Sequence, residues 1–186
     1  MAFVTNAGGN VIAYNDAADI RDKDQRVFEA NEIVYADAPT TPTSLDEYLE
    51  DLSIKAMARI NEKVRASAKW RNYLGYTSNS SLSGNTIPAF NPNKIAGRQA
   101  DWTDLASYYV LKEYLLPKVA DFGDELNSEV QKISYYASKF DDLFTELLDM
   151  MDWYDAEGDG LDAKDKLISF RTNRRTRAKS NVTRVR

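Results

Sequence analysis

The chain has 186 residues, a formal net charge of −5, and neither cysteine nor histidine. These absences exclude disulfides, thiolate and imidazole nucleophiles, and metal sites built on cysteine or histidine, so an enzyme here would depend on carboxylate, lysine, tyrosine or arginine groups. There is no run of about 18 apolar residues to predict a membrane span, and the N-terminus lacks the pattern of a signal peptide. The composition favours a protein of one domain that is not an enzyme.

Residues 1–43 are expected to form a hairpin, a short helix and a linker. Two β-prone runs within residues 3–14 flank the turn sequence Asn-Ala-Gly-Gly-Asn, which predicts a β-hairpin. Residues 16–31 predict a short helix that Asn15 or Asp16 can cap. The prolines and threonines that follow are typical of a linker.

Residues 44–166 are expected to form an all-α helical bundle of three long helices. The first helix is predicted over residues 44–73, where apolar positions recur every three or four residues. Ser44 and Glu47 give it a capping-box pattern. It ends near Trp70, one of three tryptophans that we expect to anchor a core or an interface.

The other two long helices are separated by a glycine-containing break. The second is predicted over residues 101–121, with Asp101 as its cap and Pro117 as a kink or an end. The third is predicted over residues 124–153 and has a broad apolar stripe. Amphipathic helices of this length can bury their stripes against one another as a bundle.

The segment 77–99 between the first two helices is rich in serine, asparagine, glycine and proline and is predicted to be a long loop. It carries four apolar residues, Leu82, Ile87, Phe90 and Ile95. Two interpretations remain open for them. They can fix the loop to the helical body, or they can contact a neighbouring subunit.

An acidic loop follows the third helix and partly matches a calcium-binding loop. Asp155, Glu157 and Asp159 occupy the first three ligand positions of an EF-hand pattern, but Lys166 stands where a bidentate glutamate is needed. A pattern shortened by one residue would use Asp165 as its last ligand. These four carboxylates are therefore a candidate weak calcium site, the one cofactor that the sequence indicates. The alternative is an acidic loop that only ends the helix.

The C-terminal segment 167–186 holds seven basic residues and no acidic one, and because the whole chain carries −5, residues 1–166 carry −12. An acidic body with a basic tail is typical of an interaction tail. Val182 and Val185 alternate with polar and basic residues, which suits a peptide that binds along a strand edge or a groove. The candidate partner-binding residues are Arg171, Arg174, Arg175, Arg177, Lys179, Val182, Arg184, Val185 and Arg186. Three roles remain open: docking on a partner protein, binding nucleic acid, or keeping the chain soluble.

The order of these segments resembles a known family. The stretches that carry the resemblance are FVTNAGGNVIAY, RDKDQRVFEANE, EDLSIKAMARINEKVRAS, DWTDLASYYVLKEYLLPKVADF and QKISYYASKFDDLFTELLDMMDWYD, followed by an acidic glycine loop and a basic end. In this order they resemble the head-to-tail adaptor (connector) proteins of tailed bacteriophages. The shortened acidic loop departs from the fuller pattern expected there.

The resemblance implies a structural virion protein in the neck, between head and tail, assembled in the host cytoplasm. Such proteins are small helical bundles that form a homo-oligomeric ring, typically a dodecamer, below the portal protein. The ring lengthens the DNA channel and receives the next neck or tail protein. Carried onto this chain, residues 171–186 would be an extended arm that docks on the portal, and the loop 77–99 would contact subunits or the tail side.

The sequence therefore leads to one main hypothesis and several rivals. The main hypothesis is a head–tail adaptor with no enzymatic activity, through which DNA passes without specific binding because the acidic body repels the duplex. The first rival is a nucleic-acid-associated regulator that binds DNA or RNA through the basic tail. A degenerate calcium sensor is the second rival, and a carboxylate-based enzyme, for which no motif is present, is the last.

Overall fold

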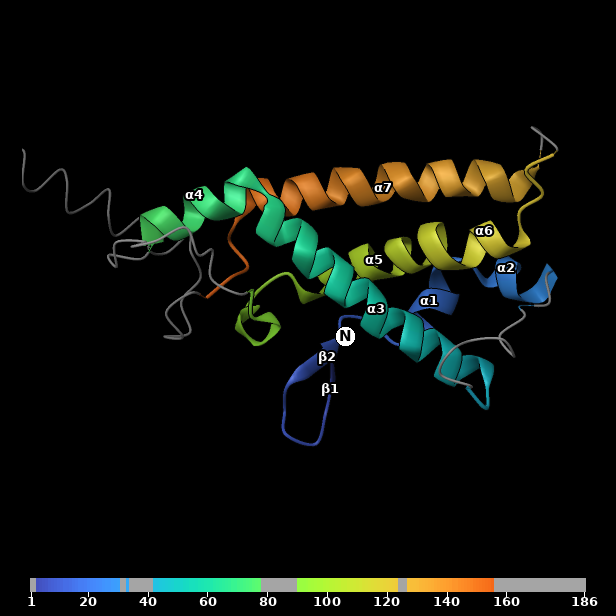
Figure 1. The fold of residues 1–186 in the computed structure, drawn as a ribbon, viewed down its shortest axis with the longest axis horizontal. Coiled ribbons are helices and arrows are strands. Elements are labelled where there is room, and N and C mark those ends of the chain that lie inside the picture. The colour runs from blue at the N-terminus through green and yellow to red at the C-terminus, as the bar shows by residue number, and fades with distance from the viewer. Residues whose placement is uncertain (1–2, 31–32, 34–41, 78–89, 124–126, 156–186) are drawn as a thin grey trace, which may run out of the picture.

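The computed structural model describes residues 3–30, 33, 42–77, 90–123 and 127–155. Helices account for 71% of them, and a two-stranded hairpin lies near the N-terminus. The predicted combination of a mostly helical fold with a small N-terminal hairpin is confirmed at this level. Figure 1 shows an elongated molecule in which the long helices lie along the same general direction and the hairpin projects from one side.

The hairpin consists of β1 (Val4–Thr5) and β2 (Val11–Ala13), which pair antiparallel. Its turn has the predicted chemistry: the Asn6 side chain accepts hydrogen bonds from the backbone N–H groups of Gly8 and Asn10, each at 3.0 Å. Gly9 has a positive φ of 75°, which glycine adopts without steric cost. A hairpin this small needs a support, and β2 packs on the helical body.

The predicted short helix over 16–31 is two helices, α1 (Ala17–Lys23) and α2 (Gln25–Ala30). Asp16 caps α1, and its carboxylate accepts a hydrogen bond from the N–H of Asp19 at 2.8 Å. The two helices are separate because Asp24 leaves the helical region, with φ −150° and ψ 75°.

The first long helix also divides, into α3 (Leu45–Ala66) and α4 (Ala68–Thr77). Ser67 has an extended conformation, with ψ at 135°, and separates them. Ser44 caps α3 as expected, since its hydroxyl accepts a hydrogen bond from the N–H of Glu47 at 3.2 Å. The return bond of the predicted capping box goes elsewhere: the Glu47 carboxylate accepts from the N–H and the hydroxyl of Thr43.

The central helical segment follows a short 3-10 turn, η1 (Pro92–Lys94), and consists of α5 (Gln99–Val110), a π turn η2 (Leu111–Leu115) and α6 (Leu116–Val119). The prediction that Asp101 caps it was wrong. Arg98 precedes the helix in a left-handed conformation, and Asp101 instead forms an ion pair with Arg98 at 2.5 Å. The expected disturbance at Pro117 occurs as the widened π turn just before it, because proline supplies no N–H for a regular turn.

The last helix, α7 (Ser128–Met150), is shorter at both ends than the predicted 124–153. The Asn127 side chain caps its start by accepting a hydrogen bond from the N–H of Glu129 at 2.9 Å. Met151 ends it in a left-handed conformation with φ 47°, so the chain reverses direction there.

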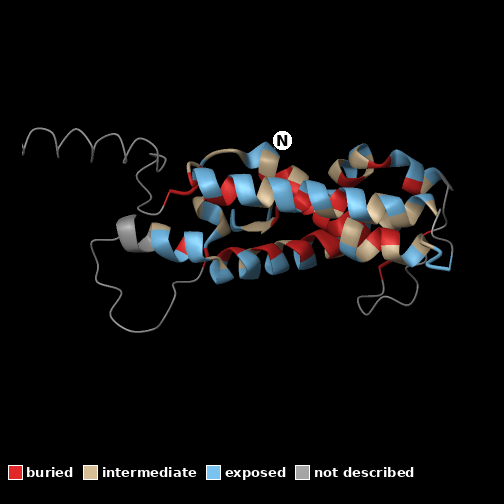
Figure 2. Ribbon diagram, turned by 90° about the horizontal axis from the view of Figure 1, so that it is seen from above, coloured by how far each residue is buried: buried red, intermediate tan, exposed pale blue. Residues whose placement is uncertain are grey.

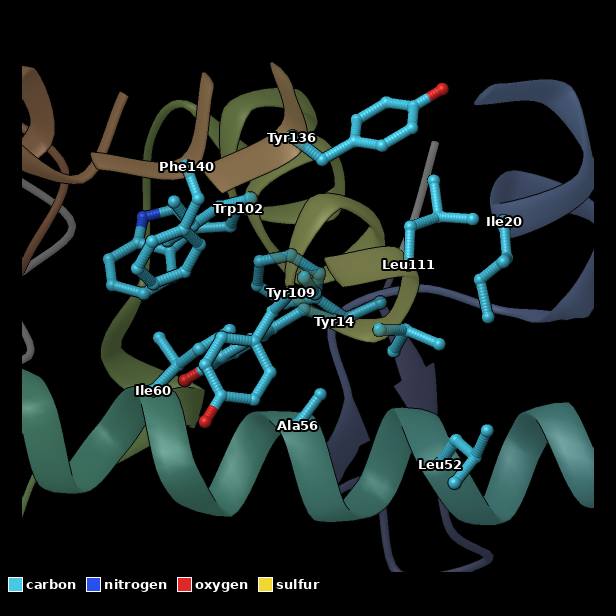
Figure 3. Close-up of a cluster of buried hydrophobic side chains, with 14 of the residues drawn as sticks. Tyr14, Ile20, Leu52, Ala56, Ile60, Trp102, Tyr109, Leu111, Tyr136 and Phe140 are labelled. Atoms are coloured by element: carbon cyan, nitrogen blue, oxygen red, sulfur yellow. The ribbon is translucent and has the colours of Figure 1, made fainter. Parts of the chain in front are cut away.

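The core lies around α5, which packs against α3 on one side and α7 on the other, and continues into η2, which also packs against α7. Figure 2 shows buried residues on the facing sides of these helices and exposed residues on their outer sides. In Figure 3, Ala56 and Ile60 of α3 point towards Trp102 and Tyr109 of α5, and Phe140 of α7 approaches from the opposite side. The helices therefore bury their apolar stripes against a common central segment.

Candidate functional site: an aromatic cluster at one end of the helices

Six aromatic side chains from four parts of the chain meet at one end of the molecule. They are Trp70 and Tyr73 of α4, Phe90, Trp102 of α5, and Trp153 and Tyr154. We call them the aromatic cluster. The ring centroids of Trp102 and Trp153 lie 4.6 Å apart, and those of Trp70 and Tyr154 lie 4.8 Å apart. All three tryptophans are completely buried, which confirms their predicted role as core anchors.

Local backbone geometry brings these rings together. The reversal at Met151 returns the chain across the end of α7, where the indole N–H of Trp153 donates a hydrogen bond to the carbonyl of Leu147 at 2.6 Å. The returning residues pair with the segment after η1: the Ala96 N–H donates to the Trp153 carbonyl at 2.8 Å, and the Asp155 N–H donates to the Lys94 carbonyl at 2.9 Å. The described chain is therefore held firmly up to its last residue.

The aromatic cluster marks the point from which two other segments of the chain start. Residues 78–89 follow α4 and rejoin the described chain at Phe90, and residues 156–186 follow Asp155. Because α4, Phe90 and Tyr154 belong to the same cluster, both ends of the first segment and the beginning of the second lie at the same end of the molecule. Tyr73 strengthens this junction by donating its hydroxyl hydrogen bond to the Tyr154 carbonyl at 2.9 Å.

Two of the four apolar residues of the predicted loop 77–99 can be assigned a role. Phe90 and Ile95 are 7% and 4% exposed, so they fix the end of the loop to the body. Leu82 and Ile87 lie outside the described residues, and their role stays a prediction.

The predicted docking residues and most of the predicted calcium ligands also lie outside the described part of the chain. This holds for every residue from Arg171 to Arg186 and for Glu157, Asp159 and Asp165. Asp155 is described and is 7% exposed. Within the described ranges, which end at Asp155, no group of three or more acidic residues could hold a metal ion. The calcium site therefore stays a prediction.

Charge is unevenly distributed around the aromatic end. From residue 55 to residue 71, α3 and α4 carry six basic residues and one acidic residue. From residue 141 to residue 155, α7 and the segment after it carry six acidic residues and no basic one. Lys69 and Asp149 form an ion pair across this boundary, and Arg98 binds Glu146 at 2.6 Å. Most of the remaining charges are exposed, although Asp155 is buried, and this makes this end suited to charged partners.

At the opposite end of the molecule, a polar contact joins α7 to the junction of α1 with α2, and no sequence pattern predicted it. Asp24, only 7% exposed in its side chain, forms an ion pair with Lys132 of α7 at 2.9 Å. The Tyr136 hydroxyl donates to the Asp24 carboxylate at 3.2 Å and to the Lys23 carbonyl at 3.1 Å. In the sequence, Asp24 looks like one of several charges on a solvated helix face, and no pattern distinguishes it.

Several tyrosines and one lysine among the described residues have a raised pKa. Burial raises the pKa of Tyr14 well above its ordinary value. Burial and the neighbouring Asp24 carboxylate raise the pKa of Tyr136. For Lys23, burial alone would lower the pKa, but the hydrogen bond and charge of Asp104 raise it. These three groups therefore stay protonated at neutral pH.

Comparison with protein-family models, with curated proteins and with solved structures finds no match. Among the described residues, none of the helices is long and apolar enough to span a membrane.

Proposed function

We propose that the protein is a head–tail adaptor of a tailed bacteriophage, a structural virion protein of the neck without enzymatic activity. In this proposal, copies form a dodecameric ring of helical bundles between the portal protein and the next neck or tail protein. The basic segment 171–186 is the arm that docks on the portal. DNA passes through the ring without specific binding, because the acidic body repels phosphate.

One observation supports this proposal most. The aromatic cluster holds the point where residues 156–186 leave the described chain, and both ends of residues 78–89, at one end of an acidic helical body. A docking segment works best when it leaves a rigid support, since less ordering entropy is then lost on binding. Repeating the segment around a ring would turn a weak contact into firm attachment.

The test is co-sedimentation of the full chain with emptied phage heads that expose the portal. We expect the full chain to sediment with the heads. The form truncated after Phe170 should stay in the supernatant, because it lacks the arm.

A charge-neutralised full chain separates loss of charge from loss of length. Arg174→Gln, Arg175→Gln and Arg177→Gln together remove three positive charges from the arm. The matched control removes three positive charges from the exposed surface of α3 and α4, through Lys55→Gln, Arg65→Gln and Arg71→Gln. We expect the arm variant to bind heads at least about tenfold more weakly than the control variant, because hydrogen bonds to charged groups are worth about 1.5–3 kcal/mol each. Equal binding by both variants would contradict the proposal.

The basic segment also supports a second candidate, a nucleic-acid-associated regulator. Seven basic residues without an acidic one would release counterions from a phosphate backbone, so the logarithm of the binding constant would fall with the logarithm of salt concentration by a slope of about −0.9 per contacted phosphate. Full-chain protein that binds DNA at moderate salt with such a slope, but does not bind heads, would favour this function over the adaptor.

A further inference from the structure

The outer side of α3 carries a row of residues that the described elements leave uncovered. The buried residues of α3 all lie on its other side, against the body of the molecule. In Figure 1, α3 runs in front of α5, and no described helix or strand lies in front of it. The members of the row, which we call the outer seam, are exposed or partly exposed: Glu47, Asp51, Ile54, Ala58, Asn61 and Arg65. They are alternately four and three residues apart, which is the spacing of a helix face that pairs with another helix.

Charge is segregated along the length of α3. Residues 46–51 hold four acidic residues and no basic one, whereas residues 55–66 hold four basic residues and one acidic one. A second copy of α3 that runs in the opposite direction would place its basic part opposite the acidic part of the first. A second copy that runs in the same direction would place like charges opposite each other. The charge pattern therefore favours antiparallel pairing of two copies.

The charged and polar positions of the outer seam complement one another in this antiparallel arrangement. The seam is symmetric about position 56, so Glu47 of one copy meets Arg65 of the other, and Asp51 meets Asn61. Neither Asp51 nor Arg65 forms an ion pair with another described residue. The Asn61 amide oxygen already accepts a hydrogen bond from the Tyr14 hydroxyl at 2.5 Å, so its N–H groups are the ones that can donate to a carboxylate. Each polar layer of the pair thus joins a donor to an acceptor.

The middle of the outer seam supplies apolar contact. Ile54 is 43% exposed, although isoleucine is among the residues that are most often fully buried. In the antiparallel arrangement it meets Ala58, whose small side chain lets the two helices approach closely. From Glu47 to Arg65 the seam is about 27 Å long. One helix from each copy makes a contact at the small end of specific interfaces, which is typical of a weak and reversible dimer.

We propose that two copies of the free protein pair antiparallel along the outer seam of α3. A two-fold axis close to position 56 relates the two copies, so a third copy cannot add through the same surface. This inference goes beyond the proposed function. A two-fold contact does not build a ring of twelve, and the pairing needs neither the portal nor the basic segment 171–186.

Analytical ultracentrifugation of the full chain tests the pairing at protein concentrations up to about 1 mM. We expect the sedimentation coefficient of the parent to rise with concentration towards that of a dimer. Ile54→Lys should keep the protein monomeric, because it places a charge in both central layers of the contact. The control is Met150→Lys, which makes the same kind of change at a side chain that is 58% exposed at the end of α7, and it should dimerise like the parent. Circular dichroism checks that both variants are folded.

Charge reversals test the antiparallel direction. Glu47→Arg alone places like positive charges in both end layers, and Arg65→Glu alone places like negative charges there. Each reversal should weaken dimerisation by about tenfold, because two repulsive contacts replace two attractive ones. An equimolar mixture of the two variants should pair as well as the parent, since opposite charges then meet in both end layers. In a parallel pair neither reversal would weaken the dimer, because like charges already face each other there.

Four results would overturn the inference. The first is a parent protein that stays monomeric up to about 1 mM. The second is an Ile54→Lys variant that dimerises as strongly as Met150→Lys. The third is a charge reversal that leaves dimerisation unchanged, and the fourth is a mixture of the two reversal variants that pairs no better than either one alone. The adaptor proposal is tested separately, by co-sedimentation with heads.

Discussion

At one end of the molecule, three buried tryptophans pack against one another and against Phe90; at the other end, a carboxylate, an ammonium group and a phenol form the main contact between α7 and the junction of α1 with α2. The aromatic end contributes large apolar area, and the packing of rings adds about 0.5–1.5 kcal/mol for each pair beyond the area that is buried. The polar end contributes a directional contact, whose strength depends on the charge of Asp24.

The aromatic end tolerates buried polar groups that lack a hydrogen-bond partner. At the aromatic end, the indole N–H groups of Trp70 and Trp102 have no hydrogen-bond partner among the described residues, which costs about 1–3 kcal/mol for each group. Packing outweighs that cost because so much apolar area is removed from water. Residues 156–186 and both ends of residues 78–89 therefore leave the described chain at an end where aromatic packing dominates.

The largest expected effect comes from breaking the aromatic end. Trp102→Ala removes a completely buried side chain that contacts Tyr14, Phe90 and Trp153, so it should lower the free energy of unfolding by about 3–5 kcal/mol. Urea unfolding followed by circular dichroism would measure it. The control is Tyr135→Ala, a ring that is 56% exposed and whose loss should cost only about 0.5 kcal/mol. Similar losses for both variants would show that the cluster is not the main anchor.

Breaking the polar end should have a smaller effect. Asp24→Ala leaves the Lys132 ammonium and the Tyr136 hydroxyl without their shared partner, and we expect a loss of about 1–3 kcal/mol. The loss stays below that of a fully buried pair because 28% of the Lys132 side chain remains accessible to water. Asp24→Asn is the control, since it keeps the shape and one acceptor oxygen. The parent and Asp24→Ala differ in their free energy of unfolding. If raising the salt concentration leaves that difference unchanged, the charge of Asp24 is not what stabilises this end.

Alkaline pH should weaken the polar end through Tyr136. Burial, together with the charge of and hydrogen bond with Asp24, raises the pKa of Tyr136 above its ordinary value of 10.0. A group whose pKa is higher in the folded state stabilises the fold fully below the unfolded pKa, and this contribution is lost as pH rises above 10 towards the folded value. Tyr136→Phe should therefore make stability fall less steeply above pH 10. Unfolding curves at several alkaline pH values would measure the slope, and an unchanged slope would refute this assignment.

Much of the fold was predictable because hydrophobic period and turn chemistry are local signals. The hairpin followed from the Asn-Ala-Gly-Gly-Asn turn, and α7 followed from its apolar stripe. The break at Ser67 was not predictable, since the apolar spacing continues through it. The left-handed conformation of Arg98 was not predictable either, because Asp101, three residues later, offered an ordinary cap. The backbone conformations at Ser67 and Arg98 allow Trp70 and Trp102 to join one cluster, so they depend on tertiary packing and not on a local signal.

The candidate site could be predicted only in part, for the same reason. Tryptophans near helix ends indicated anchors, and the sequence placed the basic segment at the C-terminus. Their common location depends on the reversal at Met151 and on the pairing of Ile95 with Tyr154, residues 59 positions apart in the sequence. Asp24 and Lys132 were missed because each is one of many charges on a polar helix face, and only the folded chain brings them together.

The smallest expected effect concerns the start of α3, where the predicted capping box forms only in part. The hydroxyl and the N–H of Thr43 both donate to the Glu47 carboxylate, at 2.6 Å and 2.8 Å, and these hydrogen bonds lower the pKa of Glu47 below its ordinary value of 4.5. A lowered pKa in the folded state stabilises the fold above the unfolded pKa, and this contribution is lost as pH falls below about 4.5. Glu47→Gln should flatten the acid side of the stability profile slightly, because the group is fully exposed. Glu50→Gln, an exposed neighbour on the same helix, is the control, and an equal change in both variants would mean that the bonds to Thr43 contribute nothing.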